Sequence, residues 1–281
     1  MSKETSEMPE VPFGPHRISR LIVGGNQQQG ASHQSRLMSL HMLEYYTEDQ
    51  TVMFLKDCIA HGIDTWQANY SEKVRNVVTR LREEGETINL ISLSSPQMAD
   101  QGDGWDNLMA LEPIGVYLFG WTADQLYHHG KMDTAVDFLA KVRDSGTQVG
   151  VGTHRPEVIE YAEEKGWDVD FYMGSLYRWG RSPEELLEIL PEVPHDGFNG
   201  MDLYLPSELP RMCEMLNKTD KTCIAFKLFA GGRTCNTPEQ VSDIVERVLG
   251  AIKPTDAVCI GMYPRFSDEI KEDTDLVKKF G

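Results

Sequence analysis

Two ionisable side chains stand near the ends of predicted β-strands, and both could move a proton at neutral pH. His154 directly follows the predicted strand 148–153, and Lys227 lies within the predicted strand 223–229. An imidazole titrates near neutrality, and a buried amine can act as a base, an electrostatic clamp or a Schiff-base nucleophile. We predict both as catalytic residues. The alternatives are a histidine that only hydrogen-bonds its loop and a lysine that points outward to a helix carboxylate.

Neutral polar and aromatic residues near other predicted strand ends could hold a substrate. Amide groups suit the oxygens of a polyol or carbonyl compound, and aromatic rings around the sixth strand could form a stacking wall for a sugar ring or a nicotinamide. His33, in the loop after the first strand, could close over the site. The predicted substrate-binding residues are Asn26, His33, Gln67, Asn69, Tyr172, Tyr177 and Trp179. Each could equally be an ordinary turn, loop or packing residue.

Short β-branched runs alternate with amphipathic helical segments along the chain. Thr47 with Gln50, and Thr237 with Gln240, indicate capped helix starts. Strict alternation favours the α/β class and a closed (β/α)8 TIM barrel, whose active site lies at the carboxyl ends of its strands. No GxGxxG motif follows the first strand, which argues against a Rossmann fold. The predicted strands are 18–26, 63–67, 88–93, 115–119, 148–153, 169–173, 223–229 and 257–261.

The chain length suits one such domain, because TIM barrels commonly have about 250 residues. We predict a single barrel domain at 18–281, preceded by a flexible N-terminal lead at 1–17 that is polar and rich in Glu and Pro. The stretch at about 178–220 is longer than a barrel connection needs. It is predicted as an insertion that could form a lid or an interface.

The charge balance is strongly acidic, with a net charge of −17 and a pI of about 4.9. No cluster of Lys and Arg interrupts it, so neither nucleic acid nor a membrane is an expected partner, whereas a small-molecule substrate is. A homo-oligomer stays open. No apolar run approaches a membrane span and no signal-like segment opens the chain, which predicts a cytoplasmic protein. The five scattered cysteines predict reduced thiols, of which Cys235 alone lies in a polar segment.

Several segments, taken in order, resemble the aldo-keto reductase superfamily. Residues 62–65 with Tyr70, Ser71 and Glu72 are similar to its second-strand motif, Gly-Ile-x-x-x-Asp-Thr-Ala followed by Tyr and Ser/Asn-Glu. The other similar segments are 18–25 (ISRLIVGG), 150–158 (GVGTHRPEV), 227–233 (KLFAGGR), 258–262 (VCIGM) and 270–273 (IKED). The resemblance implies a TIM barrel, and it implies NADPH-dependent hydride transfer with a catalytic tetrad of Asp, Tyr, Lys and His.

This chain departs from that tetrad. The resemblance assigns Asp64 to the Asp position and Tyr70 to the Tyr position, although Tyr70 lies six residues after Asp64 instead of five and Asn69 stands in the expected place. The Lys and His positions fall on 93–95 (Leu-Ser-Ser) and 119–121 (Phe-Gly-Trp), so both residues are missing. A tyrosine with an ordinary pKa of about 10 is a poor proton donor without a nearby cation and imidazole.

The cofactor is undecided. The resemblance implies NADPH, held near the last two strands by Arg233, Arg265, Lys271 and Glu272. Arg265 and Lys271 would replace the family's Lys-Ser pair and arginine that grip the 2′-phosphate, while Asp273 stands in place of the usual Asn. A divalent metal held by His154, His33 and Asp64 is a weaker alternative, since no tight spacing supports it.

Three functions follow from these residues. The leading hypothesis is an enzyme that acts on a small, sugar-like hydroxylated carbonyl compound by proton transfer, as an isomerase, epimerase or lyase. The alternative is an NADPH-dependent reductase in which Tyr70 is the acid and Lys227 or His154 replaces the lost partners. The third is a catalytically silent barrel that binds a metabolite.

Overall fold

Eight parallel strands close into a barrel in the computed structural model, which describes residues 7–101, 104–189 and 203–281. The strands follow one another around the barrel in chain order, and β10 pairs with β3 to complete the ring. The predicted TIM barrel is thereby confirmed. The strands are β3 (Leu21–Gly24), β4 (Thr65–Gln67), β5 (Asn89–Ser94), β6 (Gly115–Leu118), β7 (Gln148–Thr153), β8 (Phe171–Ser175), β9 (Thr222–Phe226) and β10 (Ala257–Ile260).

Strand boundaries depart from the prediction at two points that matter for the site. β9 ends at Phe226, so Lys227 opens the following loop and is not a strand residue as predicted. Lys227 has φ 62°, a left-handed conformation that cannot continue a β-ladder. The predicted first strand, 18–26, is divided between a separate hairpin and β3.

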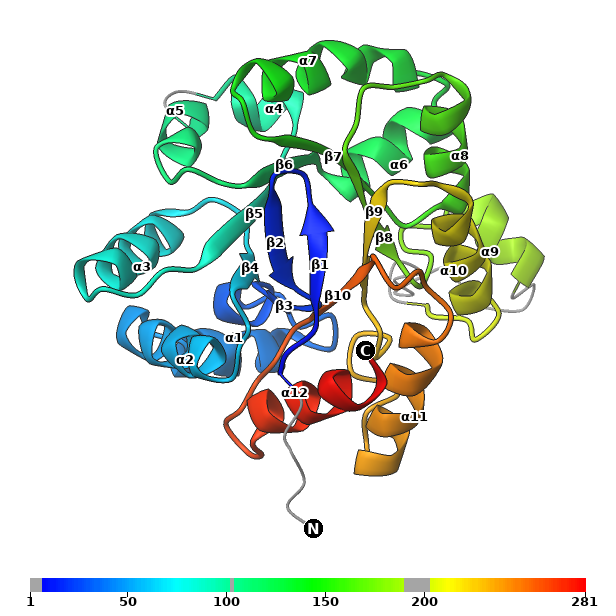
Figure 1. The fold of residues 1–281 in the computed structure, drawn as a ribbon. Helices are drawn as coiled ribbons and strands as arrows, with labels where there is room; N and C mark the ends of the chain where they lie inside the picture. Colours follow the sequence, from blue (N-terminus) through cyan, green and yellow to red (C-terminus); the bar gives the residue numbers. More distant parts are fainter. Residues whose placement is uncertain (1–6, 102–103, 190–202) are drawn as a thin grey trace.

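Helices cover the outside of the barrel (Figure 1). Two predicted caps are confirmed, because Thr47 accepts a hydrogen bond from the backbone N–H of Gln50 and Thr237 accepts one from Gln240. No helix in the described ranges is both long and apolar enough to cross a bilayer. The helices are α1 (Arg36–Tyr45), α2 (Glu48–Ala60), α3 (Glu72–Glu83), α4 (Pro96–Ala99), α5 (Gly104–Met109), α6 (Gly120–His128), α7 (Val136–Asp144), α8 (Pro156–Glu164), α9 (Pro183–Ile189), α10 (Glu208–Lys218), α11 (Pro238–Leu249) and α12 (Glu269–Phe280), with short 3₁₀ turns η1 (Gln27–Gln29) and η2 (Met132–Ala135).

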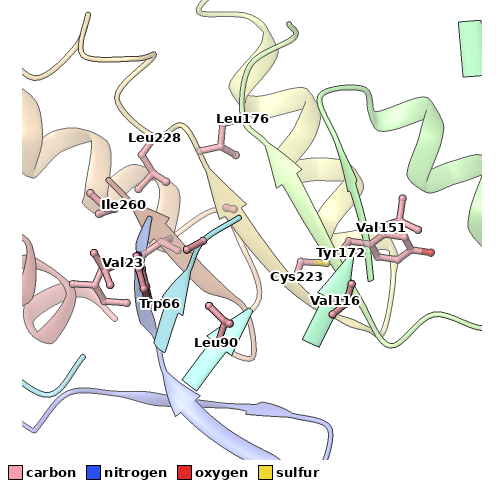
Figure 2. Packing of buried hydrophobic residues seen from close by; sticks show 14 of the residues in the cluster. Val23, Trp66, Leu90, Val116, Val151, Tyr172, Leu176, Cys223, Leu228 and Ile260 are labelled. Atoms are coloured by element: carbon pink, nitrogen blue, oxygen red, sulfur yellow. The ribbon is translucent and has the colours of Figure 1, made fainter. Parts of the chain in front are cut away.

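Alternate strand residues pack into two separate cores. Side chains that face the helices form the larger one, and Figure 2 shows Val116, Val151 and Tyr172 within it. Side chains that face the barrel axis form the smaller one, which includes Tyr117 and Phe171. Because neighbouring residues of a strand point to opposite faces, one position of error in a strand moves a side chain from one core to the other.

A β-hairpin closes the amino-terminal end of the barrel, where a flexible lead was predicted. Strands β1 (Glu10–Phe13) and β2 (His16–Ser19) pair antiparallel, and Figure 1 shows this hairpin across the middle of the barrel. Phe13 is only 1% exposed, and its ring centroid lies 4.8 Å from that of Phe171. The prediction of a flexible lead is thus wrong for residues 10–17, because their apolar side chains fill the inner core. Residues 1–6 lie outside the described ranges.

The predicted insertion at 178–220 contains a regular barrel helix. α10 connects β8 to β9 and buries Leu209, Met212 and Leu216, which belong to the larger core. Ahead of it lies α9, where Glu185 accepts hydrogen bonds from Arg155 (2.9 Å) and Arg178 (2.7 Å). The additional segment is therefore shorter than predicted, and its residues 190–202 lie outside the described ranges.

Candidate active site

A cavity of about 530 Å³ opens at the carboxyl ends of β3, β4, β9 and β10. On its barrel side it is bordered by Asn26, Gln67 and Lys227, and on its helix side it reaches α12. Predicted substrate-binding residues Asn26, His33 and Gln67 all line it, as does Lys227. The structure therefore brings four of the predicted catalytic and substrate-binding residues to one cavity.

His154 lies just past the end of β7 and is held by Asp124 of α6. The imidazole Nδ1 lies 2.8 Å from the Asp124 carboxylate, which also accepts a 2.6 Å hydrogen bond from the Thr153 hydroxyl. Because a carboxylate oxygen only accepts, Nδ1 of His154 carries the hydrogen. Nε2 then bears a lone pair in the neutral ring, and this atom has no hydrogen-bond partner within 7–101, 104–189 and 203–281.

Burial lowers the pKa of His154 below its ordinary value of 6.5, and the positive charges of Lys227 and Arg155 lower it further. The Asp124 carboxylate acts in the opposite direction without reversing the shift. His154 is 6% exposed. The imidazole is consequently neutral at pH 7 and able to accept a proton.

Trp179 connects His154 with the cavity residues. Its ring lies 5.3 Å from that of His154 and 5.9 Å from that of His33, and the ammonium of Lys227 lies 5.6 Å from its centroid. The buried indole N–H has no hydrogen-bond acceptor among the described residues. Phe226, which borders the cavity, packs edge-on against His154 at 5.6 Å. His154 thus lies directly behind the cavity wall.

Two loops meet over the cavity through His33 and Lys227, whose Nε2 and Nζ atoms are 2.9 Å apart. Arg233 donates a 3.2 Å hydrogen bond to the His33 carbonyl and stacks 4.7 Å from the centroid of Tyr204. His33 (φ 55°), Lys227 (φ 62°) and Ala230 (φ 51°) all adopt left-handed backbone conformations. Such conformations are costly for residues other than glycine and concentrate at functional sites.

Asp64 lies at the opposite end of the barrel. It directly precedes β4, and its carboxylate accepts hydrogen bonds from the backbone N–H and the hydroxyl of Ser19 in the hairpin, each at 2.9 Å. A strand spans the barrel, so Asp64 cannot reach Lys227 or His154 at the carboxyl ends. The structure therefore removes Asp64 from the candidate site, and it also separates the three proposed metal ligands. No metal-binding group of three or more His, Cys, Asp or Glu occurs in the described part of the chain.

Gln67, and not Asp64, occupies the Asp position of the aldo-keto reductase motif. Counted from Gly62 and Ile63, the motif Gly-Ile-x-x-x-Asp places its carboxylate at residue 67, the last residue of β4. There the Gln67 amide donates a 2.9 Å hydrogen bond to the hydroxyl of Tyr117 inside the barrel. Tyr70, the predicted acid, instead donates to the Glu72 carboxylate at 3.1 Å and does not line the cavity.

The other four predicted substrate-binding residues, Asn69, Tyr172, Tyr177 and Trp179, do not line the cavity. Tyr172 faces the helices, where its hydroxyl donates a 2.5 Å hydrogen bond to Glu163, because its strand position has outward parity. Tyr177 is buried in the same outer core. Asn69 offers its backbone carbonyl to Gln29 at 3.1 Å. Of the predicted stacking wall, only Trp179 contacts the residues of the site.

The predicted cofactor residues are also dispersed. Arg265 lies on the surface with its guanidinium 5.8 Å from the Tyr45 ring, and Lys271 is exposed and paired with Asp275. Arg233 joins the two loops, as described above. Only Glu272 lines the cavity, beside Glu269 and Asp273.

Sequence reasoning missed Asp124, Tyr117 and the acidic lining. Asp124 lies on α6, while the histidine it holds follows the next strand, and no local spacing joins residues 30 apart in the chain. Tyr117 and Glu269 likewise require the barrel to be closed before their neighbours are known. The described cysteines are free, and Cys235, the one predicted to differ, lines the cavity and is the only one not fully buried.

The resident NADPH that the resemblance implies does not fit these residues. Glu269, Glu272 and Asp273 line the groove at the start of α12, whereas Arg265 and Lys271 are turned to the surface. A 2′-phosphate needs cationic or N–H donors, and carboxylates would repel it.

Solved structures share the architecture at low sequence identity. A putative 2,5-diketo-D-gluconic acid reductase B matches with a TM-score of 0.53 and 12% identity over 98% of this chain and 87% of its own. The glycerol dehydrogenase of Gluconobacter oxydans matches with a TM-score of 0.51 and 12% identity over 98% and 96%. A truncated 3-deoxy-D-arabino-heptulosonate 7-phosphate synthase from Thermotoga maritima has a TM-score of 0.50 and 12% identity over 97% and 91%.

No protein-family model and no curated protein matches the chain. Identities of 12% establish architecture and leave activity to be argued from the site. The fold of this chain is a TIM barrel, an architecture that it shares with these reductase, dehydrogenase and synthase structures.

Proposed function

We propose that this barrel is an enzyme that transfers a proton on a small hydroxylated carbonyl compound, without hydride chemistry. The observation that carries the proposal is the buried Asp124–His154 pair, whose imidazole lies behind the wall of a cavity that Lys227 borders and whose Nε2 has no hydrogen-bond partner in the described ranges. An imidazole fixed through one nitrogen and neutral at pH 7 is suited to act as a general base.

The proton comes from the carbon next to the substrate carbonyl. Nε2 of His154 takes this proton, and the electron pair of the broken C–H bond forms a C=C bond while the carbonyl oxygen becomes an enolate. Lys227 supplies the positive charge that stabilises this oxygen, with His33 as its hydrogen-bond partner. For isomerisation, the hydroxyl on the original carbon passes its proton to the former carbonyl oxygen and becomes the new carbonyl, while His154 returns its proton to the former carbonyl carbon. For epimerisation, water delivers a proton to the other face of the original carbon and His154 releases its proton to solvent.

Neutral groups orient the substrate. Asn26 and Gln67 border the barrel side of the cavity, and their amides suit hydroxyl oxygens. The indole N–H of Trp179 has no acceptor among the described residues and becomes a further donor if this ring, which does not line the cavity, turns toward it. Contact between substrate and His154 requires the Phe226 or Trp179 ring to turn aside, because these rings pack against the imidazole.

The residues at the tetrad positions do not supply the proton donor that reduction of a carbonyl group needs. Gln67 stands at the Asp position, and β5 ends at Ser94 without a lysine. Burial raises the pKa of Tyr117, the tyrosine that does lie inside the barrel, far above its ordinary value of 10. A phenol in that state holds its proton too firmly to serve as an acid.

Solvent deuterium exchange tests the proposal on a panel of candidate substrates. Small aldoses and ketoses are incubated with the protein in D₂O without any nicotinamide, and proton NMR follows the signal of the hydrogen next to the carbonyl. We expect at least one compound to lose this signal in proportion to enzyme concentration. Turnover that occurs only when NADPH is added, with hydride delivered to the substrate, would contradict the proposal.

A further inference from the structure

The helix side of the cavity is lined by acidic residues of α12. Glu269, Glu272 and Asp273 all border it, and within 7–101, 104–189 and 203–281 none of the three forms a salt bridge. Glu269 is anchored through one carboxylate oxygen, which accepts a 2.6 Å hydrogen bond from the backbone N–H of Tyr263. The start of α12 therefore presents carboxyl groups to the cavity, and burial raises the pKa of Glu269 above its ordinary value.

Asp273 is a buried acid whose carboxyl group has no partner in the part of the chain that the structure describes. It is 5% exposed, it borders the cavity, and it makes no hydrogen bond or ion pair with any described residue. Burial and the negative charges of Glu269 and Glu272 raise its pKa well above the ordinary value. A buried carboxyl group that faces a cavity without a partner is costly unless something else supplies the missing interaction.

A second acceptor at the cavity is also unsatisfied. Gln27 lines the cavity, and its side-chain oxygen is buried with no hydrogen-bond partner in the described part of the chain. Carboxylates and an amide oxygen accept hydrogen bonds, and the complementary ligand group is therefore a donor with positive charge.

Within the described ranges, no basic residue forms a salt bridge with this lining. Lys227 borders the barrel side and is hydrogen-bonded to His33, and Lys271 is paired with Asp275 on the surface of α12. The guanidinium of Arg265 lies over the exposed ring of Phe266 at 5.8 Å. The carboxyl groups on this side of the cavity thus have no cationic partner in the described ranges.

We infer that the α12 side of the cavity binds the protonated amine or guanidinium group of a small organic molecule, between Asp273, Glu269 and Glu272. A metal ion fits less well, because the described residues form no metal-binding cluster. Tyr263, which lines the same wall, offers an aromatic surface of the kind that organic cations contact. This inference does not depend on the reaction proposed above.

Calorimetric titration with putrescine, a diamine, tests the inference, and 1,4-butanediol is the matched probe without charge. We expect saturable binding of putrescine and none of the diol. Asp273→Asn and Glu272→Gln should each weaken putrescine binding about 10-fold, as loss of a charged hydrogen bond does. Asp275→Asn, the same change on the outer face of the same helix, should leave binding unchanged, because Asp275 is paired with Lys271 outside the cavity.

Proton release provides a second readout. The groups that act on the Asp273 site are Glu269 and Glu272 on α12, Cys235 before α11 and Cys58 on α2. A bound cation favours the ionised carboxylate, so binding should release a proton from Asp273. The released proton is measured by repeating the calorimetric titration in buffers of different ionisation enthalpy. Asp273→Asn should abolish this release. Putrescine that binds no better than 1,4-butanediol, or equally well to the Asp273→Asn protein, would overturn the inference.

Discussion

Replacement of His154 with Gln is expected to slow deuterium exchange into the substrate by about 10²- to 10⁴-fold, the range typical for loss of a general base. Glutamine keeps much of the volume and polarity of histidine but cannot accept the proton. The NMR exchange assay measures the rate, and thermal unfolding followed by circular dichroism establishes that the variant is folded. His129→Gln is the matched control, because His129 is exposed at the end of the helix that carries Asp124. Equal rates for the wild type and the His154 variant would remove His154 from the mechanism.

The pH profile distinguishes a base from a structural histidine. The neutral form is active, and burial lowers the pKa of His154 below 6.5, so the midpoint of the acid limb of the activity profile should lie below pH 6.5. The Asp124 carboxylate raises this pKa, and Asp124→Asn should move the acid limb to still lower pH as well as reduce the rate. Asp124 is a positioning residue, and a purely structural role would not shift the acid limb.

Truncation of the hairpin at Phe13→Ala is expected to lower the free energy of unfolding by about 3–5 kcal/mol, the usual cost of removing a buried phenylalanine side chain. Phe13 is 1% exposed and packs on Phe171 in the inner core. Its ring has room there because residue 115 is glycine, and a Cβ at that position would lie 2.9 Å from the Phe13 Cζ atom. Urea unfolding measures the difference. His16→Ala is the control, since His16 pairs with Phe13 across the hairpin and is exposed. A Phe13→Ala loss no larger than that of His16→Ala would show that the hairpin does not contribute to the barrel core.

The fold was predictable because its signals are local. Each apolar strand and each capped helix can be recognised from its own stretch of sequence. Eight strand–helix repeats in strict alternation are compatible with few folds, of which the closed barrel is the simplest. The hairpin was missed because residues 10–19 contain two prolines and a glycine and only a few apolar side chains. The burial of Val11, Phe13 and Ile18 depends on the end of the barrel that they cover.

The candidate site was predictable only where chain position fixes spatial position. His154, Asn26 and Gln67 stand at or next to strand ends, and their place at the carboxyl end of the barrel follows from the fold. Asp64 was assigned to the wrong end of its strand, because it precedes β4 instead of following it. The Asp position of the motif falls three residues later, at residue 67, where β4 ends at the mouth of the cavity. Tyr172 was predicted on the wrong face of its strand, because successive strand residues point to opposite faces. Its neighbours Phe171 and Met173 face the barrel axis, whereas Tyr172 faces the helices.

Titration of the protein with NADPH, followed by nicotinamide fluorescence, tests most directly the claim that this barrel does not use hydride transfer. The acidic lining of Glu269, Glu272 and Asp273 predicts no saturable binding at micromolar concentrations. Tight binding of one NADPH per chain, with the fluorescence change of an enclosed nicotinamide, would contradict the account.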